Sequence, residues 1–349
     1  MLFGKKKSTV GLDIGSHQIK VVEIQKDKKG ARLLNYGIAP LAPEAIVEGE
    51  IMDRGLVIEA IKNLLETQHI KCRDVVSAIS GRGVIVKRIM VERMKESEAR
   101  ERMKWEAEQH VPFAITDVSL DFQILNPEAG ENQMEVLLVA VKNETINTLV
   151  DLITAAGLNP VVIDCGVFAM QNVFETNYES LPEEMIALVN IGADMTNINF
   201  VKNSIPAFTR DLPIAGNSCA QQIQKNLGLS FEQSLNLMKG EEVKETTQEN
   251  AKSVIRSFTS DFAGGIERTL SFLSASGESE KMSRIFLSGG GALIPGVEEF
   301  LKEHFGIPVE ILNPLRKIGF DPALFGVTGA ERVAPILTTA IGLGLKEVR

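Results

Sequence analysis

The 349-residue sequence has few cysteines and no long apolar run. Its three cysteines, Cys72, Cys165 and Cys219, lie far apart, and none has a cysteine or histidine partner at the spacing of metal ligands. We therefore expect three reduced, mostly buried thiols. No apolar run approaches the roughly 18 residues that cross a bilayer, so we expect no direct membrane span.

The sequence also lacks an excess of basic residues. Its 37 Lys and Arg are outnumbered by 46 Asp and Glu, which gives a formal net charge of −9. Because DNA and RNA are polyanions, this balance opposes binding to nucleic acid. The first residues, MLFGKKKS, are basic, but no apolar segment follows them. We therefore expect no signal peptide and a cytoplasmic protein.

Val- and Ile-rich strand segments alternate with helical segments along the chain, which predicts an α/β architecture. A chain of this length is expected to form about two domains, and the polar, proline-containing segment 175–185 is the expected boundary. In the charged segment 95–111, one apolar stripe recurs every four residues and predicts a packed helix. The only tryptophan, Trp105, falls on the more polar side of that helix, where it either anchors a partner or covers the sheet of its own subdomain. The stripe consists of Ala99, Met103, Ala107 and Val111.

A repeat at half-chain spacing is the most informative pattern. The segment GLDIGSHQIKVVEI aligns without a gap on LVNIGADMTNINFV, so that Asp13 falls on Asn190 and Gly15 on Gly192. This repeat predicts two related domains that face each other, each with a glycine hairpin. Glycine lets the backbone come close to a ligand, and successive N–H groups can bind an anion. In that setting Asp13 is suited to accept hydrogen bonds from the hydration shell of Mg²⁺.

A third glycine cluster occurs in IFLSGGGALIPGVEEFL, residues 285–301. The order of strand, three glycines and helix suits a nucleoside site, because a flat ring can lie against the bare backbone. The cluster is not a Walker A loop, since no Gly-Lys-Ser/Thr follows it.

The motifs LDIGS, VNIGADMTN and LSGGGALIPG resemble the phosphate-1, phosphate-2 and adenosine motifs of the actin, Hsp70 and sugar kinase superfamily. Within it the chain resembles the FtsA-related branch and, most closely, the PilM family of type IV pilus assembly. Segments 79–89, 105–113, 119–125 and 137–146 carry the closer likeness. The resemblance implies an actin-like (ribonuclease H-like) α/β two-domain fold with a 1C-type insertion at about residues 80–140. The implied domains are 1–180 plus 334–349, and 181–333 with subdomains 2A and 2B.

The same resemblance implies ATP and Mg²⁺ in the cleft between the domains, with Asp13 organising the water around the metal. No catalytic residue can be assigned. Asn190 stands where many relatives have an aspartate, and an amide is no general base; ATPase activity is therefore expected to be weak or absent. The residues implied to bind the cofactor are Asp13, Gly15, Ser16, His17, Lys20, Asn190, Gly192, Ala193, Asp194, Thr196, Gly216, Asn236, Lys239, Gly289, Gly290 and Gly291.

The resemblance also implies partners. PilM proteins receive the N-terminal cytoplasmic peptide of PilN in a groove between the insertion and domain 1A, and they work with other pilus platform and motor proteins at the inner membrane. This chain is accordingly expected to be peripheral to that membrane through its protein partners. The groove residues proposed here are Val84, Val86, Arg88, Pro112 and Phe113.

Two other functions stay open. One is a small-molecule kinase of the same superfamily, which needs an oriented nucleophile; Asp164 and Gln171 lie nearest to the expected place, and each is expected to be structural. The other is a filament-forming cell-division ATPase like FtsA, which attaches by a C-terminal amphipathic helix. The sequence ends PILTTAIGLGLKEVR, which looks like the closing helix of the fold without such a tail. Self-association into a homo-oligomer is a further open question.

Overall fold

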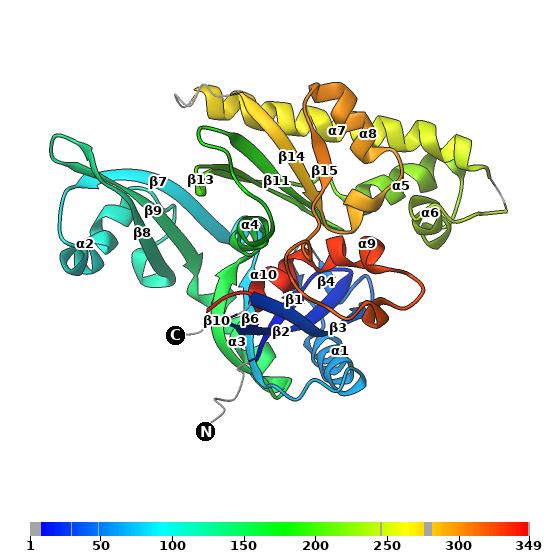
Figure 1. The fold of residues 1–349 in the computed structure, drawn as a ribbon, viewed down its shortest axis with the longest axis horizontal. Helices are drawn as coiled ribbons and strands as arrows, with labels where there is room; N and C mark the ends of the chain where they lie inside the picture. The colour runs from blue at the N-terminus through cyan, green and yellow to red at the C-terminus, as the bar shows by residue number, and fades with distance from the viewer. Residues whose placement is uncertain (1–7, 29, 48, 245, 276–280, 348–349) are drawn as a thin grey trace.

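The computed structural model describes residues 8–28, 30–47, 49–244, 246–275 and 281–347. Two five-stranded sheets dominate it, one above the other in Figure 1. In spatial order, the first sheet contains β10 (Asn159–Cys165), β6 (Asp74–Ile79), β1 (Ser8–Ile14), β2 (Gln18–Asp27) and β3 (Gly30–Pro40). The second contains β15 (Val309–Ile311), β14 (Met282–Ser288), β11 (Met185–Ile191), β12 (Thr196–Lys202) and β13 (Ile205–Leu212).

The two sheets share one topology. In each, the first strand in sequence pairs antiparallel with the second and parallel with a later strand, since β1 joins β2 and β6 while β11 joins β12 and β14. The register is also equivalent: Asp13 faces Lys20 in the first hairpin, and Asn190 faces Asn197 in the second. The structure therefore confirms the half-chain repeat predicted from the sequence.

Helices cover the first sheet on both faces. On one face, α1 (Arg54–Thr67) and α3 (Asn143–Ala155) pack into a core with the strands. Asp53 caps α1, because its carboxylate accepts a hydrogen bond from the Leu56 backbone N–H. The helix then buries residues at helical spacing against the sheet. These residues are Val57, Ile61, Leu64 and Leu65.

Between the two sheets lie α4 (Gly166–Asn177) and α10 (Thr338–Gly344), the latter preceded by α9 (Ala330–Val333). A single hydrophobic cluster joins these helices to strands of both sheets, with Ile24 from the first and Phe286 from the second. At Gly342 the helices touch backbone to backbone, since an added Cβ would overlap the Ala169 carbonyl oxygen. This layer fixes how the two halves are placed relative to each other.

The second sheet is covered on its outer side by helices of the C-terminal half. They share a core with its strands, and Figure 1 shows the long α7 running along the top of the molecule. These helices are α5 (Gly216–Leu227), α6 (Phe231–Met238), α7 (Gln248–Ala275) and α8 (Val297–Phe305).

The insertion forms a separate three-stranded sheet, at the left in Figure 1. Its order is β7 (Val84–Glu92), β9 (Gln133–Lys142) and β8 (Val118–Gly130), and α2 (Glu96–Glu108) covers one face. The predicted stripe is buried there, although α2 ends at Glu108 and Val111 follows it in the next segment. Trp105 is 73% exposed and does not cover the sheet. A short hairpin of β4 (Ile46–Val47) and β5 (Glu50–Ile51) completes the strands described.

No described helix combines the length and the apolar character that a membrane crossing requires. The three thiols are free, as expected, and they differ in exposure: Cys165 and Cys219 are buried, and Cys72 is partly exposed. Burial raises the pKa of both buried thiols to about 12.

In the native protein at pH 8, we expect an aromatic disulfide reagent to modify Cys72 alone, because the thiolate is the nucleophile and the other two thiols stay protonated and shielded. The measurement is the thiolate released with and without denaturant, and all three thiols should react once the chain is unfolded. A Cys72→Ser variant is the control and should lose the native reaction. Rapid native modification of that variant would contradict the buried positions of Cys165 and Cys219.

Candidate functional site

The turn between β1 and β2 carries the first group of predicted residues. The Gly15 N–H donates a hydrogen bond to the Gln18 carbonyl at 3.1 Å and closes the turn, which also contains Ser16 and His17. At its base the Lys20 Nζ lies 3.0 Å from the Asp13 Oδ2. Both side chains are largely shielded from solvent, with 15% and 20% exposure, so an ammonium group and a carboxylate are held together at the base of the turn.

The turn between β11 and β12 repeats this geometry. The Gly192 N–H donates to the Met195 carbonyl, again at 3.1 Å, at the equivalent position of the repeat. The start of α5 holds this turn from behind, because the Gly216 N–H donates to the Gly192 carbonyl at 3.0 Å and the Asn217 N–H to the Ala193 carbonyl at 2.8 Å. The N–H of Gly216 therefore supports the turn from within the protein.

Two polar side chains complete the second turn. The Asn217 Nδ2 donates to the Asp194 Oδ1 at 2.6 Å, which orients that carboxylate. The fully buried Thr196 hydroxyl donates to the Ile214 carbonyl at 2.7 Å and fixes the segment that leads into α5. These contacts hold the second turn in place.

The glycine run after β14 lies against the end of β11. Gly289 has a φ of +81°, and an added Cβ would lie 2.5 Å from the Asn190 Oδ1. A Cβ at Gly291 would overlap the Ile191 side chain, whereas a Cβ at Gly290 would meet no atom within 4 Å. The structure therefore brings the predicted phosphate-2 and adenosine segments together and leaves Gly290 open on its outer side.

Charged groups from both halves of the chain affect the titration of His17 in the first turn. Burial lowers the pKa of its imidazole below the usual 6.5, and nearby Lys239 and Lys20 lower it further, while Asp194 acts in the opposite direction. Lys239 and Asp194 belong to the second half of the chain, and Asn236 lies on α6 one turn before Lys239. Charges of the second half therefore act on the imidazole of the first turn.

These residues suit a nucleotide bound with Mg²⁺. Mg²⁺ in such sites keeps several waters and takes one or two carboxylates together with phosphate oxygens, and Asp13 at the first turn provides a carboxylate of that kind. Lys20 and Lys239 would supply positive charge if phosphate bound here, and the bare backbone at Gly290 would leave room for a ring.

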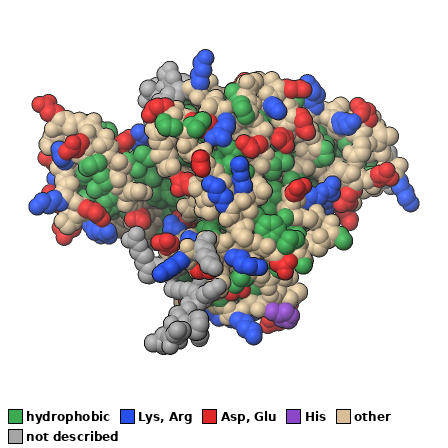
Figure 2. All heavy atoms as spheres, in the orientation of Figure 1, with side chains coloured by type: hydrophobic (Ala, Val, Ile, Leu, Met, Phe, Trp, Pro, Cys, Tyr) green, Lys and Arg blue, Asp and Glu red, His purple; other side chains and the backbone are tan. Residues whose placement is uncertain are grey.

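The predicted groove residues separate onto different surfaces. Val86 and Arg88 line a cavity of about 390 Å³ whose other wall includes Phe208 of β13 and Phe272 of α7. Val84 instead packs against the core under α1 and α3. Figure 2 shows a hollow with hydrophobic side chains between the insertion, at the left, and the rest of the molecule.

The other two predicted groove residues lie at the covered side of the insertion sheet. Phe113 packs into the cluster beneath α2, and the Lys142 Nζ lies 4.5 Å from its ring centroid. Pro112 precedes it on the exposed loop after α2. The structure therefore does not bring Pro112 and Phe113 to the cavity that Val86 and Arg88 line.

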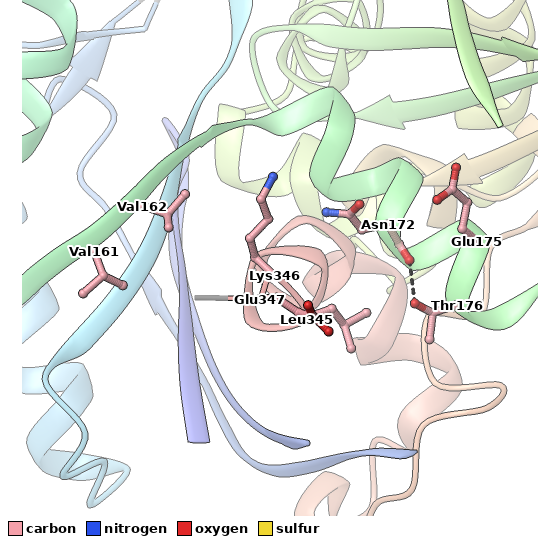
Figure 3. Close-up of a pocket in the computed structure, with 8 residues that line it drawn as sticks. All are labelled: Val161, Val162, Asn172, Glu175, Thr176, Leu345, Lys346 and Glu347. Atoms are coloured by element: carbon pink, nitrogen blue, oxygen red, sulfur yellow. Dashed lines mark hydrogen bonds between the residues drawn. The ribbon is translucent and has the colours of Figure 1, made fainter. Parts of the chain in front are cut away.

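A second cavity, of about 750 Å³, was not anticipated from the sequence. Figure 3 shows Val161 and Val162 of β10 on one side, Asn172 and Glu175 of α4 on the other, and the residues after α10 between them. The walls come from segments far apart in the chain, so no local sequence pattern points to it.

Asp164 and Gln171, which lie nearest in the sequence to the place expected for a catalytic base, both have partners within the protein. Asp164 pairs with Lys346 at 2.8 Å, and its other oxygen accepts the Cys165 N–H at 2.9 Å. The Gln171 amide donates to Glu175 at 2.7 Å and to the Ser204 carbonyl at 2.9 Å. These contacts agree with the structural roles expected for both residues.

The family model described as "Type IV pilus assembly protein PilM" matches residues 11–348. The chain belongs to the PilM family. A chain of the solved "PilM-PilN type IV pilus biogenesis complex" is 27% identical, with a TM-score of 0.86 and 99% of each chain covered. Both findings agree with the resemblance drawn from the sequence motifs.

More distant structures share the fold alone. The ethanolamine utilization protein EutJ from Carboxydothermus hydrogenoformans is 13% identical, with a TM-score of 0.58 over 97% of this chain and 89% of that one. MreB5 of Spiroplasma citri, solved bound to AMPPNP, is 12% identical, with a TM-score of 0.52 over 96% and 95%. The actin-like two-domain α/β fold expected from the motifs is therefore confirmed.

Neighbouring glycines of the run after β14 offer a matched test of its packing. Gly291→Ala is expected to lower the free energy of unfolding by about 1–3 kcal/mol, because the new methyl group would overlap Ile191. Gly290→Ala should change it by less than about 0.5 kcal/mol, since that side is open. Urea unfolding of both variants measures the difference, and equal stability would contradict the close approach of the run to β11.

Proposed function

We propose that this protein is an ATP-binding scaffold of the type IV pilus assembly platform at the inner membrane. In this proposal ATP and Mg²⁺ bind between two domains, residues 1–180 plus 334–349 and residues 181–333, and the N-terminal peptide of PilN binds beside the insertion. One observation carries it: each half of the chain contributes a glycine turn of equivalent register and hydrogen bonding, in a chain of the PilM family.

The first turn is suited to the phosphates and the metal. Lys20 already lies beside Asp13, so its ammonium group is placed to contact an incoming phosphate while Asp13 orients water around Mg²⁺. Bound Mg²⁺ would neutralise part of the phosphate charge. In the other half, backbone N–H groups at the start of α5 hold the second turn in its conformation, so little reorganisation is needed when a ligand enters.

Binding is better supported than hydrolysis. Asn190 lies beside Gly289, where it offers an amide and no titratable oxygen. Asp164 and Gln171 are engaged in contacts inside the protein. We therefore propose that ATP serves mainly to hold the two halves together, with slow turnover or none.

The protein is expected to bind Mg–ATP saturably, and Lys20→Ala is expected to weaken that binding by about tenfold or more, because one charge-assisted contact to phosphate is lost. Isothermal titration calorimetry measures both affinities. Lys28→Ala is the control, since Lys28 is an exposed lysine just beyond the far end of β2. Absence of Mg–ATP binding in the unmodified protein would refute the proposed nucleotide site.

The peptide is proposed to contact the cavity between the insertion sheet and β13. The similar solved structure is described as a PilM-PilN complex, and the cavity has apolar walls from Val86 and Phe208 together with the charged Arg88. Through PilN the protein would lie at the cytoplasmic face of the inner membrane, near the other platform and motor proteins.

Val86→Asp is expected to weaken binding of a synthetic PilN N-terminal peptide by about tenfold, since a charge would replace apolar contact in the cavity. Fluorescence anisotropy of a labelled peptide measures this. Met90→Asp is the matched control, because Met90 is an exposed residue farther along the same strand. Equal affinity of the Val86→Asp variant and the unmodified protein would place the peptide elsewhere.

A further inference from the structure

The cavity of about 750 Å³ between β10 and α4 takes no part in the nucleotide and peptide sites proposed above. Figure 3 shows Val161 and Val162 of the edge strand β10 on one side and Asn172 of α4 on the other. Leu345, just after α10, lines the cavity between them. The Asn172 carbonyl already accepts a hydrogen bond from the Thr176 hydroxyl at 2.7 Å. An occupant would therefore find its apolar contacts on β10 and after α10.

The charged groups at this cavity are acidic in excess. Glu175 and Glu347 line it and are exposed. Two lysines compensate part of the negative charge: Lys346 pairs with Asp164 at 2.8 Å, and Lys26 donates a hydrogen bond to the backbone carbonyl two residues before Glu347. Among these groups three carboxylates face two ammonium groups, so positive charge on an occupant would be favoured at the rim.

The chain enters the first sheet close to the same cavity. The strands β1, β6 and β10 run parallel, with Val10 opposite Val75 and Val75 opposite Pro160. Because neighbouring strands lie about 4.8 Å apart, the cavity wall at Val161 is roughly 10 Å across the sheet from the start of β1 and about level with it. The seven residues before β1 can span up to about 24 Å when extended. They are therefore long enough to reach into the cavity.

These seven residues, MLFGKKK, lie outside the residues that the structure describes, but their sequence suits the cavity in order and in chemistry. Lys5–Lys7 directly precede β1, at the distance of the acidic rim. Gly4 allows the backbone to turn there. Met1–Phe3 are apolar and come at the distance of the inner walls.

We propose that the cavity between β10 and α4 is a binding site for an apolar segment followed by basic residues, and that it is occupied by this chain's own segment Met1–Lys7. Leu2 and Phe3 leave water against Val161 and Leu345, and the lysines face the carboxylates of the rim. Because the segment is tethered beside the cavity, it binds at an effective concentration of about a millimolar, so modest contacts suffice. The site is independent of the nucleotide and the PilN peptide.

Photo-crosslinking of the whole protein locates the segment. Phe3 is replaced by p-benzoylphenylalanine, the protein is irradiated at low concentration, and the crosslinked peptides are identified by mass spectrometry. We expect a product of monomer size in which position 3 is joined to the β10 peptide that contains Val161 or to the peptide that contains Leu345. The control carries the same group at Trp105, which is 73% exposed on the insertion, and should give no crosslink to these peptides.

Crosslinks of position 3 only to other parts of the protein, or none at all, would overturn the proposal. A crosslink to the cavity found only in a covalent dimer would also overturn it, because a second copy would then supply the segment.

Competition with a synthetic peptide, MLFGKKKS carrying a fluorescent label at its C-terminal end, tests occupancy by a second route. Fluorescence anisotropy measures its affinity for the unmodified chain and for the double variant Leu2→Ser, Phe3→Ser, which keeps the length and the lysines. We expect the double variant to bind the peptide about five- to tenfold more tightly, because the tethered segment no longer competes.

Met52→Ser is the matched control, since Met52 is another exposed apolar residue and its loss should leave the affinity of the unmodified chain unchanged. Equal affinity of the unmodified chain and the double variant would overturn occupancy by the chain's own segment. Failure of the double variant to bind the peptide would overturn the site itself.

Discussion

Two backbone hydrogen bonds, from Gly15 to Gln18 and from Gly192 to Met195, close the turns on which the candidate site depends. The second turn leaves no room for a side chain, since a Cβ at Gly192 would lie 2.7 Å from the Met195 carbonyl oxygen. Because the strands that flank the two turns pair in the same register, both turns end equivalent hairpins. The repeat therefore supplies two equivalent turns. Whether both can contact one ligand depends on how the two halves are placed relative to each other.

That placement is set by the layer of α4 and α10 between the sheets. Its core joins Ile24 to Phe286, and the backbones of Gly342 and Ala169 are in contact. A close-packed layer of this kind resists compression and bending. Movement of one half against the other is consequently expected as small sliding within this layer or rotation at the connecting segments.

The sequence sufficed for features that depend on local pattern, namely the repeated hairpin and the buried stripe of the insertion helix. The sequence did not suffice where the surroundings of a residue depend on a segment distant in the chain. Strand alternation places Val86 and Ile89 on opposite faces of β7, but only the packed structure tells which face α2 covers. Likewise, Gly216 begins a helix at the site, yet its N–H is used by Gly192, a contact that no spacing in the sequence reveals.

The cavity beside the insertion lies between the insertion sheet and the sheet that carries the second turn. One wall carries Val86 of the insertion, and the other carries Phe208 of β13, a strand of the sheet that also forms the second turn. A ligand that draws the second turn toward the first would therefore move β13 relative to β7 and change the width of this cavity. Nucleotide can favour one width only by its difference in affinity for the two states, and a peptide in the cavity must then change the nucleotide affinity by the same factor.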